Sequence, residues 1–179
     1  PSLIGISLTA ITASMLGEDY TQSIDQATAK LQELAPNVQS FAPNPDEYQS
    51  VITGQTVLGL GQNGRGQYYS EQSGGKMGVV FPEEGTALQI NTINLVKDAP
   101  NPEAAKTFMD YALSSEAQSA FASALFYAPT VNNADVPADV AARIVPTDGS
   151  LKIIPLDVEF LAANRDAWTD IWKREIIGQ

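Results

Sequence analysis

Apolar residues recur at helical spacing near both ends of the chain. One helical segment covers residues 8–16 and ends at Gly17, and a second lies between an expected cap at Thr21 and Pro36. A final helix begins near Asp157. The apolar positions of these last two helices are Ile24, Ala27, Leu31 and Leu34 in one, and Leu161, Trp168, Trp172 and Ile176 in the other. We expect both stripes, tryptophans included, to pack in a core rather than to form a platform for a ligand.

Helices and strands alternate through the middle of the chain. Short helices are predicted at residues 47–53 behind the cap Asp46, at 66–72, at 102–113 behind Asn101, at 115–125 behind Ser114 or Ser115, and at 137–144. Short apolar runs predict strands at residues 38–42, 54–61, 77–81 and 88–96, the last with imperfect alternation. Helices that alternate with short strands indicate an α/β protein.

The amino-acid composition limits the kinds of ligand and of catalytic site that this chain can have. The 179 residues include 10 Lys and Arg against 21 Asp and Glu, for a formal charge of −11, with no His and no Cys. Nucleic acids and anionic membranes are poor partners for such a surface, because both require basic groups. Without His or Cys, the usual zinc sites, thiolate nucleophiles and Ser-His-Asp triads are excluded. The aspartates show no metal-loop spacing, so neither a cofactor nor a metal is expected.

Three stretches together resemble one known family. They are residues 54–65 (GQTVLGLGQNGR), residues 84–118, which include Asn101-Pro-Glu-Ala-Ala105 and Ser114-Ser-Glu-Ala-Gln118, and residues 163–172 (ANRDAWTDIW). Their order resembles the periplasmic solute-binding proteins of ABC importers, in the branch of the spermidine/putrescine-binding proteins, which has the type II periplasmic-binding fold. The resemblance is continuous over residues 84–129 and weaker over nearly all the rest.

The resemblance implies two α/β lobes joined by crossing strands, with a solute held between lobes that close on a hinge. In those terms residues 1–87 are an α/β portion of the second lobe, residues 88–132 are a crossing strand and helices of the first lobe, and residues 133–179 return to the second. Most of the N-terminal lobe is then missing, and we expect the chain to be a fragment. The implied function is non-enzymatic: a periplasmic component captures a small polar solute and delivers it to an ABC permease.

The same resemblance indicates candidate ligand contacts. In the polyamine binders an aromatic stands where this chain has Gln62, followed by the Asn-Gly kept here as Asn63-Gly64. Another aromatic stands at Gln89 and an acid at Asn91. Aromatic faces and carboxylates suit a diammonium ligand, whereas amides and the nearby Arg65 favour a neutral polar or anionic solute at least as well. Two further candidates are Ser7 and Tyr127.

Each candidate also has a purely structural interpretation. Asn63-Gly64 is a common tight-turn pair, and Gln89 and Asn91 are equally consistent with an exposed strand edge. Ser2 and Ser7 precede an apolar helical segment, where hydroxyl groups usually serve as caps. Tyr127 is expected to pack at the hinge, although it is also within possible reach of the cleft.

Two other functions compete with solute binding. The first is a carboxylate-based hydrolase such as a glycosidase, with Glu83 and Glu84 as its acids; neighbours in sequence diverge in space, so this pair is poorly placed for catalysis. The second is an interaction domain whose acidic surface binds a basic partner in a salt-sensitive way. Neither accounts for the motifs at residues 101–105 and 164–168.

Overall fold

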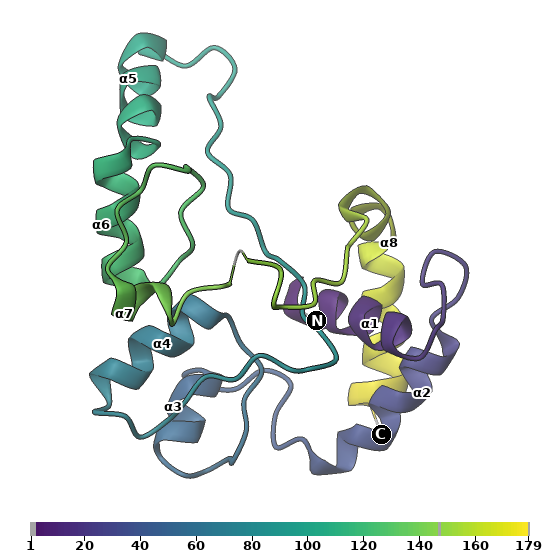
Figure 1. The fold of residues 1–179 in the computed structure, drawn as a ribbon. Helices are drawn as coiled ribbons and strands as arrows, with labels where there is room; N and C mark the ends of the chain where they lie inside the picture. Colours follow the sequence, from purple (N-terminus) through teal and green to yellow (C-terminus); the bar gives the residue numbers. More distant parts are fainter. Residues whose placement is uncertain (1–2, 147, 179) are drawn as a thin grey trace. The chain divides into compact units, whose positions relative to one another are not determined.

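The computed structural model describes residues 3–146 and 148–178, so the expected cap at Ser2 lies outside the described residues. The chain divides into two compact units, each built from separated segments. Unit 1 comprises Pro1–Gly59, Phe81–Leu88 and Leu151–Gln179, and unit 2 comprises Leu60–Val80 and Gln89–Ser150. The course of the chain through both units can be followed in Figure 1. Of the helices described, none is both long and apolar enough to cross a membrane.

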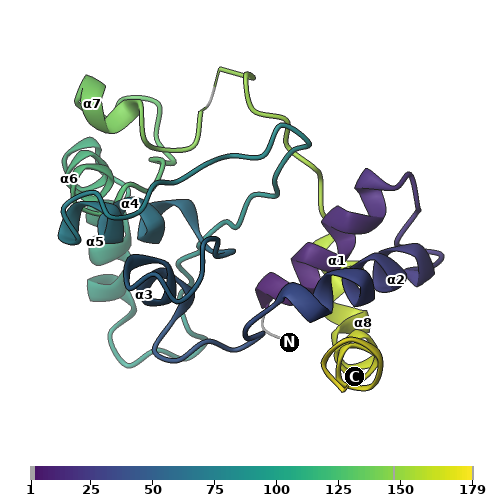
Figure 2. The same cartoon turned by 90° about the horizontal axis from the view of Figure 1, so that it is seen from below.

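Unit 1 is a helical assembly with an apolar centre. Its elements are α1 (Leu3–Met15), α2 (Asp25–Leu34), the short 3-10 helix η1 (Ala35–Asn37), α3 (Glu47–Ile52), α8 (Val158–Ile171) and the π-helical η2 (Trp172–Ile177). Figures 1 and 2 both show α1, α2 and α8 side by side. Two groups of buried side chains lie between them: Ile6, Ala10, Ile24, Leu161 and Trp168 in one, and Leu31, Trp172 and Ile176 in the other. The predicted core role of both tryptophans is confirmed.

The start of α2 differs from the sequence prediction. Thr21 does not cap the helix, which begins at Asp25 with no capping hydrogen bond from its N-cap residue. Instead the buried carboxylate of Glu18 accepts from the backbone N–H groups of Gln26 and Ala27, each at 3.0 Å, and from the hydroxyl of Ser23 at 2.9 Å. Glu18 therefore satisfies N–H groups that the first turn of a helix leaves open.

Unit 2 contains α4 (Asn63–Gln72), α5 (Pro102–Ala112), α6 (Ser115–Leu125) and α7 (Ala138–Ala141). Helices α5 and α6 follow one another almost end to end, with α4 and α7 at the far end of α6 (Figure 1). Of the two caps predicted for α6, Ser114 is used: its side chain accepts from the N–H of Ala117. The helix ends at Phe126, in the left-handed conformation, and this ring is buried with Val140 and Ile144.

The predicted strands are wrong, because all four segments are irregular in the structure. In the described parts of the chain the single strand-like contact is an isolated parallel bridge between Thr86 and Ile153. Gly54 does not begin a strand: with φ of 74° it ends α3, and its N–H donates to the carbonyl of Val51. A strand is stable only when neighbouring strands form hydrogen bonds with its backbone N–H and C=O groups. An apolar sequence pattern does not show whether such neighbouring strands exist. The α/β class expected from the sequence is therefore not confirmed for the described residues, which form helices and irregular segments.

Several helix boundaries also shift. The first helix begins at Leu3 rather than at residue 8, so Ser7 lies inside α1 and is not a cap. Helix α4 begins at Asn63 rather than at residue 66, and the expected Asn63-Gly64 turn is its first turn. The caps predicted for α3 and α8 are confirmed, since Asp46 accepts from the N–H of Gln49 and Asp157 from that of Phe160.

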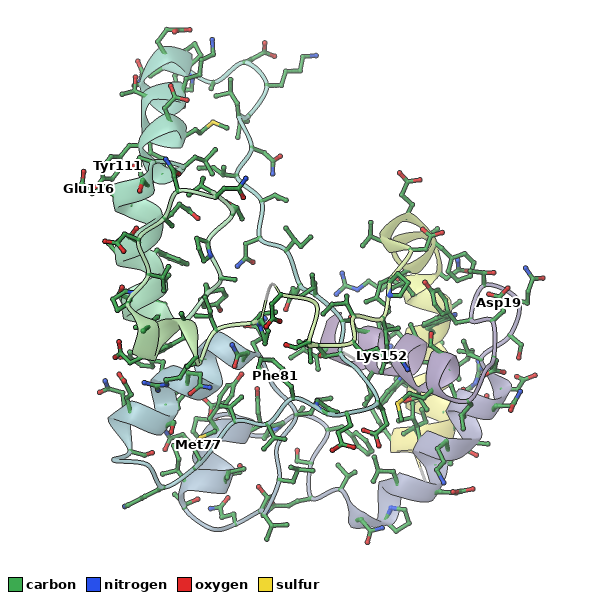
Figure 3. The ribbon with its side chains drawn as sticks, viewed as in Figure 1. Asp19, Met77, Phe81, Tyr111, Glu116 and Lys152 are labelled. Atoms are coloured by element: carbon green, nitrogen blue, oxygen red, sulfur yellow. The ribbon has the colours of Figure 1, made fainter. Side chains whose placement is uncertain are left out.

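One face of unit 2 is apolar and exposed. Helix α5 has no buried residue, although its apolar positions cluster on one side. Tyr111 and Glu116 project from the same side of α5 and α6 (Figure 3). The extended segment that precedes α5 is exposed throughout residues 89–98. The most exposed large apolar side chains of this region are Ile90 (73%), Val96 (74%) and Phe108 (62%). Exposed apolar side chains gathered in one region are typical of a surface that binds another molecule.

Candidate functional site

Two amides and a phenol meet at the start of α4 in unit 2. The Nε2 of Gln62 donates to Oε1 of Gln89 at 2.5 Å, and the hydroxyl of Tyr127 donates to Oε1 of Gln62 at 3.4 Å. Gln62 is the N-cap residue of α4, Gln89 begins the extended segment, and Tyr127 follows the end of α6. Three of the predicted site residues, separated by up to 65 positions in sequence, are therefore joined by hydrogen bonds.

Close packing between α4 and α6 places Tyr127 at this cluster. Gly64 is buried, and a Cβ atom built on it would lie 2.8 Å from the carbonyl oxygen of Leu125 and 2.8 Å from two carbons of the Tyr127 ring. Only glycine permits this approach. The Tyr127 ring also packs against Phe121, with ring centroids 5.6 Å apart. The phenol therefore reaches Gln62 from a position fixed by packing on two sides.

Asn63 is turned toward another part of unit 2. Its Nδ2 donates to the backbone carbonyl of Arg143 at 3.2 Å, while its Oδ1 is buried without a hydrogen-bond partner among the described residues. A carbonyl accepts only from a donor, so the amide must present Nδ2 to Arg143. In this structure Asn63 attaches α4 to the segment after α7 and makes no hydrogen bond to the amide cluster.

The other predicted contacts lie outside this cluster. Arg65 and Asn91 are exposed side chains of unit 2, in the first turn of α4 and in the extended segment. No hydrogen bond within the described residues joins either of them to Gln62, Gln89 or Tyr127. Ser7 is half-buried in α1 and belongs to unit 1. The cluster of amides thus contains three of the seven candidates, with Asn63 adjacent to it.

Arg143 is the residue that the sequence analysis missed. Its guanidinium pairs with Glu71 at 2.5 Å and donates to the side chain and the backbone carbonyl of Gln67, at 3.1 and 3.2 Å. No local pattern marks Arg143, because its partners lie more than 70 residues earlier in the chain. In the sequence, Arg143 stands between the apolar residues Val140 and Ile144. This is the one local hint that its partner lies elsewhere in the chain.

Unit 1 has two hollows, and Tyr20 lines both. One of about 340 Å³ is lined by the aromatic rings of Tyr20, Phe160 and Trp168, and one of about 390 Å³ is lined by Met15, Lys152 and their neighbours. The nearby carboxylates, Glu18 and Asp19, form hydrogen bonds within the fold. Hydrogen bonds from the Thr21 hydroxyl and N–H hold the pKa of Asp19 below its usual value. Within the described residues no three acidic side chains gather as a metal site would require.

Comparison with known proteins identifies the class. The family described as bacterial extracellular solute-binding protein matches residues 5–147, which is most of the chain. This chain therefore belongs to the bacterial extracellular solute-binding protein family, whose place is outside the cytoplasmic membrane. The resemblance seen in the sequence motifs is thereby confirmed.

Two relatives illustrate the range of the family. The gamma-aminobutyric acid-binding protein of Pseudomonas aeruginosa is 28% identical over 108 residues, which are 60% of this chain and 30% of the relative. The spermidine/putrescine-binding periplasmic protein 1 of Haemophilus influenzae is 33% identical over 110 residues, which are 61% of this chain and 29% of the relative. The matches thus span under a third of the length of each relative. No solved structure matches the chain significantly.

Proposed function

We propose that this chain is part of the solute-binding component of an ABC importer, and that it captures a small polar solute and delivers it to the permease without catalysing a reaction. The observation that carries the proposal is the cluster of Gln62, Gln89 and Tyr127, because amide and phenol groups recognise polar solutes by hydrogen bonds. Membership of the extracellular solute-binding family supports it.

The proposed site includes the predicted residues around this cluster. Gln62, Gln89 and Tyr127 are its centre, and Asn91 and Arg65 are exposed side chains of the same unit that we propose contact the solute on closure. Asn63 lies next to the cluster, in the first turn of α4, and is proposed as a further contact of the solute. Ser7 remains a candidate contact from unit 1. Lobe closure around the solute gives the permease a distinct form to recognise.

The chemistry of the cluster favours a solute with hydrogen-bonding groups over one recognised by charge alone. The groups that meet there are neutral, and the exposed charged side chain in the first turn of α4 is the cation Arg65. We therefore propose a neutral polar, zwitterionic or anionic solute, such as an amino acid or a small carboxylate. The similarity to a gamma-aminobutyric acid-binding protein agrees with this choice, and the similarity to a spermidine/putrescine-binding protein keeps the polyamines as the alternative.

The exposed apolar face of unit 2 supports a second part of the proposal, a covering first lobe. Ile90, Val96 and Phe108 are large apolar side chains exposed to water, and the matched relatives are about three times as long as the matched segment. We propose that the remaining first-lobe sheet packs on this face in the whole protein. The permease is then the second macromolecular partner.

A calorimetric panel tests the function directly. The chain is titrated with 4-aminobutyrate, glutamate, putrescine, spermidine and glucose, and the variant Gln62→Leu is titrated in parallel. Saturable heat with one of these probes, weakened by Gln62→Leu, supports the proposal. Turnover of a glycoside substrate, or binding only to a basic protein with strong salt dependence, would instead support one of the two rival functions.

A further inference from the structure

Arg143 binds one face of helix α4 along most of its length. Nη1 pairs with the carboxylate of Glu71, while Nε and Nη2 donate to the side chain and the carbonyl of Gln67. The backbone carbonyl of Arg143 accepts from Asn63. Asn63, Gln67 and Glu71 are four residues apart and so share a single face of the helix. One residue therefore holds three consecutive turns of α4.

The same arginine is anchored at the end of α6. Its guanidinium carbon lies 4.0 Å from the centroid of the Phe126 ring, which is 2% exposed. Phe126 is the left-handed residue that ends α6, and the next residue is Tyr127, whose hydroxyl donates to Gln62. Arg143 thus links the face of α4 to the point in the chain from which Tyr127 reaches the amide cluster.

We propose that Arg143 is a positioning residue of the solute site, an inference that rests on the proposed function. It sets the rotation of α4 about its axis against the end of α6. Rotation of a helix by one residue is about 100°, which would carry the side chain of Gln62 away from Gln89 and Tyr127. The hydrogen bonds and the ring contact described for Arg143 go to α4 and Phe126 rather than to these two residues. It acts through α4.

The exposure of the side chains around Arg143 distinguishes a role in positioning α4 from a role in stabilising the fold. The Arg143 and Glu71 side chains are 30% and 52% exposed, and ion pairs so accessible to water contribute little to stability. The contacts to Gln67 and to the Phe126 ring are directional and partly buried. Loss of the ion pair alone should therefore change little, whereas loss of the whole side chain should free the rotation of α4.

Three variants of the 179-residue chain test this. Arg143→Met removes the ion pair and every side-chain hydrogen bond of this residue, Glu71→Gln removes only the ion pair, and Arg165→Met is a matched control at an exposed arginine of α8. Arg143→Lys, which keeps a positive charge without the planar fork, is the second variant should Arg143→Met fail to fold. Circular dichroism and thermal melting report the fold of each, and NMR reports the side-chain NH₂ signals of Gln62 and Gln89.

We expect Arg143→Met, or Arg143→Lys in its place, to shift both amide signals and to abolish the contact between the two side chains, with most other signals unchanged. Glu71→Gln and Arg165→Met should leave the amide signals in place. Unchanged amide signals in Arg143→Met would refute the positioning role, and so would shifts spread throughout the chain with a large fall in melting temperature. These readouts require no solute.

Calorimetry with 4-aminobutyrate and putrescine adds the functional arm. The affinity for whichever probe binds the wild-type chain should fall about tenfold or more in Arg143→Met and less than about threefold in Glu71→Gln. Equal losses in both variants would contradict the proposal. If neither probe binds the wild-type chain, as the proposed need for a covering lobe allows, the amide signals alone decide the role of Arg143.

Discussion

The indole Nε1 of Trp172 donates a hydrogen bond to Oγ1 of Thr9 at 2.8 Å, across 163 positions of sequence and wholly within the core of unit 1. The Thr9 hydroxyl donates in turn to the carbonyl of Gly5 at 3.0 Å. Thr9 is fully buried and Trp172 is 3% exposed. The polar end of the tryptophan is therefore satisfied inside the core, which lets an apolar stripe carry an indole at this position.

Replacing Thr9 by Val tests the value of this bond. The substitution keeps the shape of the side chain but leaves the indole N–H buried without an acceptor, which should cost about 1–3 kcal/mol of unfolding free energy. Urea denaturation followed by tryptophan fluorescence measures it. In the double variant Thr9→Val/Trp172→Phe both partners are removed, and we expect its loss to be smaller than the sum of the two single losses. Additive losses would argue against the bond.

Glu18 should make the stability of unit 1 depend on pH. Burial by itself raises the pKa of this carboxyl, but hydrogen bonds from the N–H groups of Ala27 and Gln26 and from the Ser23 hydroxyl outweigh it, so the pKa lies below the ordinary 4.5. A group whose pKa is lower in the folded state stabilises the fold above the unfolded pKa. That contribution is present above pH 4.5 and is lost as the pH falls through the lower, folded value.

The variant Glu18→Gln isolates this contribution. It removes the charge and places an N–H₂ group against backbone donors, so at neutral pH it should cost about 1–2 kcal/mol, as other lost helix caps do. The difference from the wild-type chain in urea denaturation should shrink steadily below pH 4.5. Glu33→Gln, at an exposed residue of α2 that pairs with Lys30, is the control and should cost less than about 0.5 kcal/mol. A difference that does not change with pH would count against the carboxylate as the cap.

Gly64→Ala should disturb the amide cluster through packing. The new Cβ meets the Leu125 carbonyl and the Tyr127 ring at 2.8 Å, so the ends of α4 and α6 must separate, at a cost of about 1–3 kcal/mol. The affinity for any solute that binds at Gln62 should fall as well. Gly78→Ala is the matched control, because nothing lies within 4 Å of its added methyl group. Equal melting temperatures of the two variants would contradict the packing described.

Sequence patterns predicted where the helices lie in the chain better than they predicted which residues connect one helix to another. The caps at Asp46, Ser114 and Asp157 follow local rules, because a capping side chain reaches N–H groups only two or three residues ahead. Glu18 caps α2 from eight residues before Gln26, through a loop whose path the sequence does not encode locally. No local rule therefore reveals it.

The strands and the site likewise depend on contacts between distant parts of the chain, which local sequence patterns do not reveal. Residues 88–96 have the apolar alternation of a strand, yet they are exposed, and a strand also requires neighbouring strands, which the described residues do not supply there. Gln62 and Gln89 became candidates through resemblance to the family, and their hydrogen bond is a contact over 27 positions that composition cannot indicate. Arg143 offered no motif, since its role depends on partners from a distant helix.

The exposed apolar face of unit 2 leads to the last prediction. Ile90, Val96 and Phe108 are each more than 60% exposed, and an uncovered surface of this kind tends to bind another apolar surface. We expect the 179-residue chain on its own to self-associate in solution, despite its charge of −11. If the proposed first lobe supplies the other wall of the solute site, the affinity of this chain alone should be about a thousandfold weaker than that of a protein with both lobes.

Light scattering and calorimetry test both parts. Phe108→Asp adds charge among the exposed apolar side chains of unit 2 and should shift the chain toward monomer, whereas Val158→Asp, at an exposed apolar residue of α8 in unit 1, should not. The reason for the difference is that an isolated exposed side chain buries little on association, while the face of unit 2 buries several at once. A monodisperse wild-type monomer that binds 4-aminobutyrate or putrescine with sub-micromolar affinity would show that no covering lobe is required.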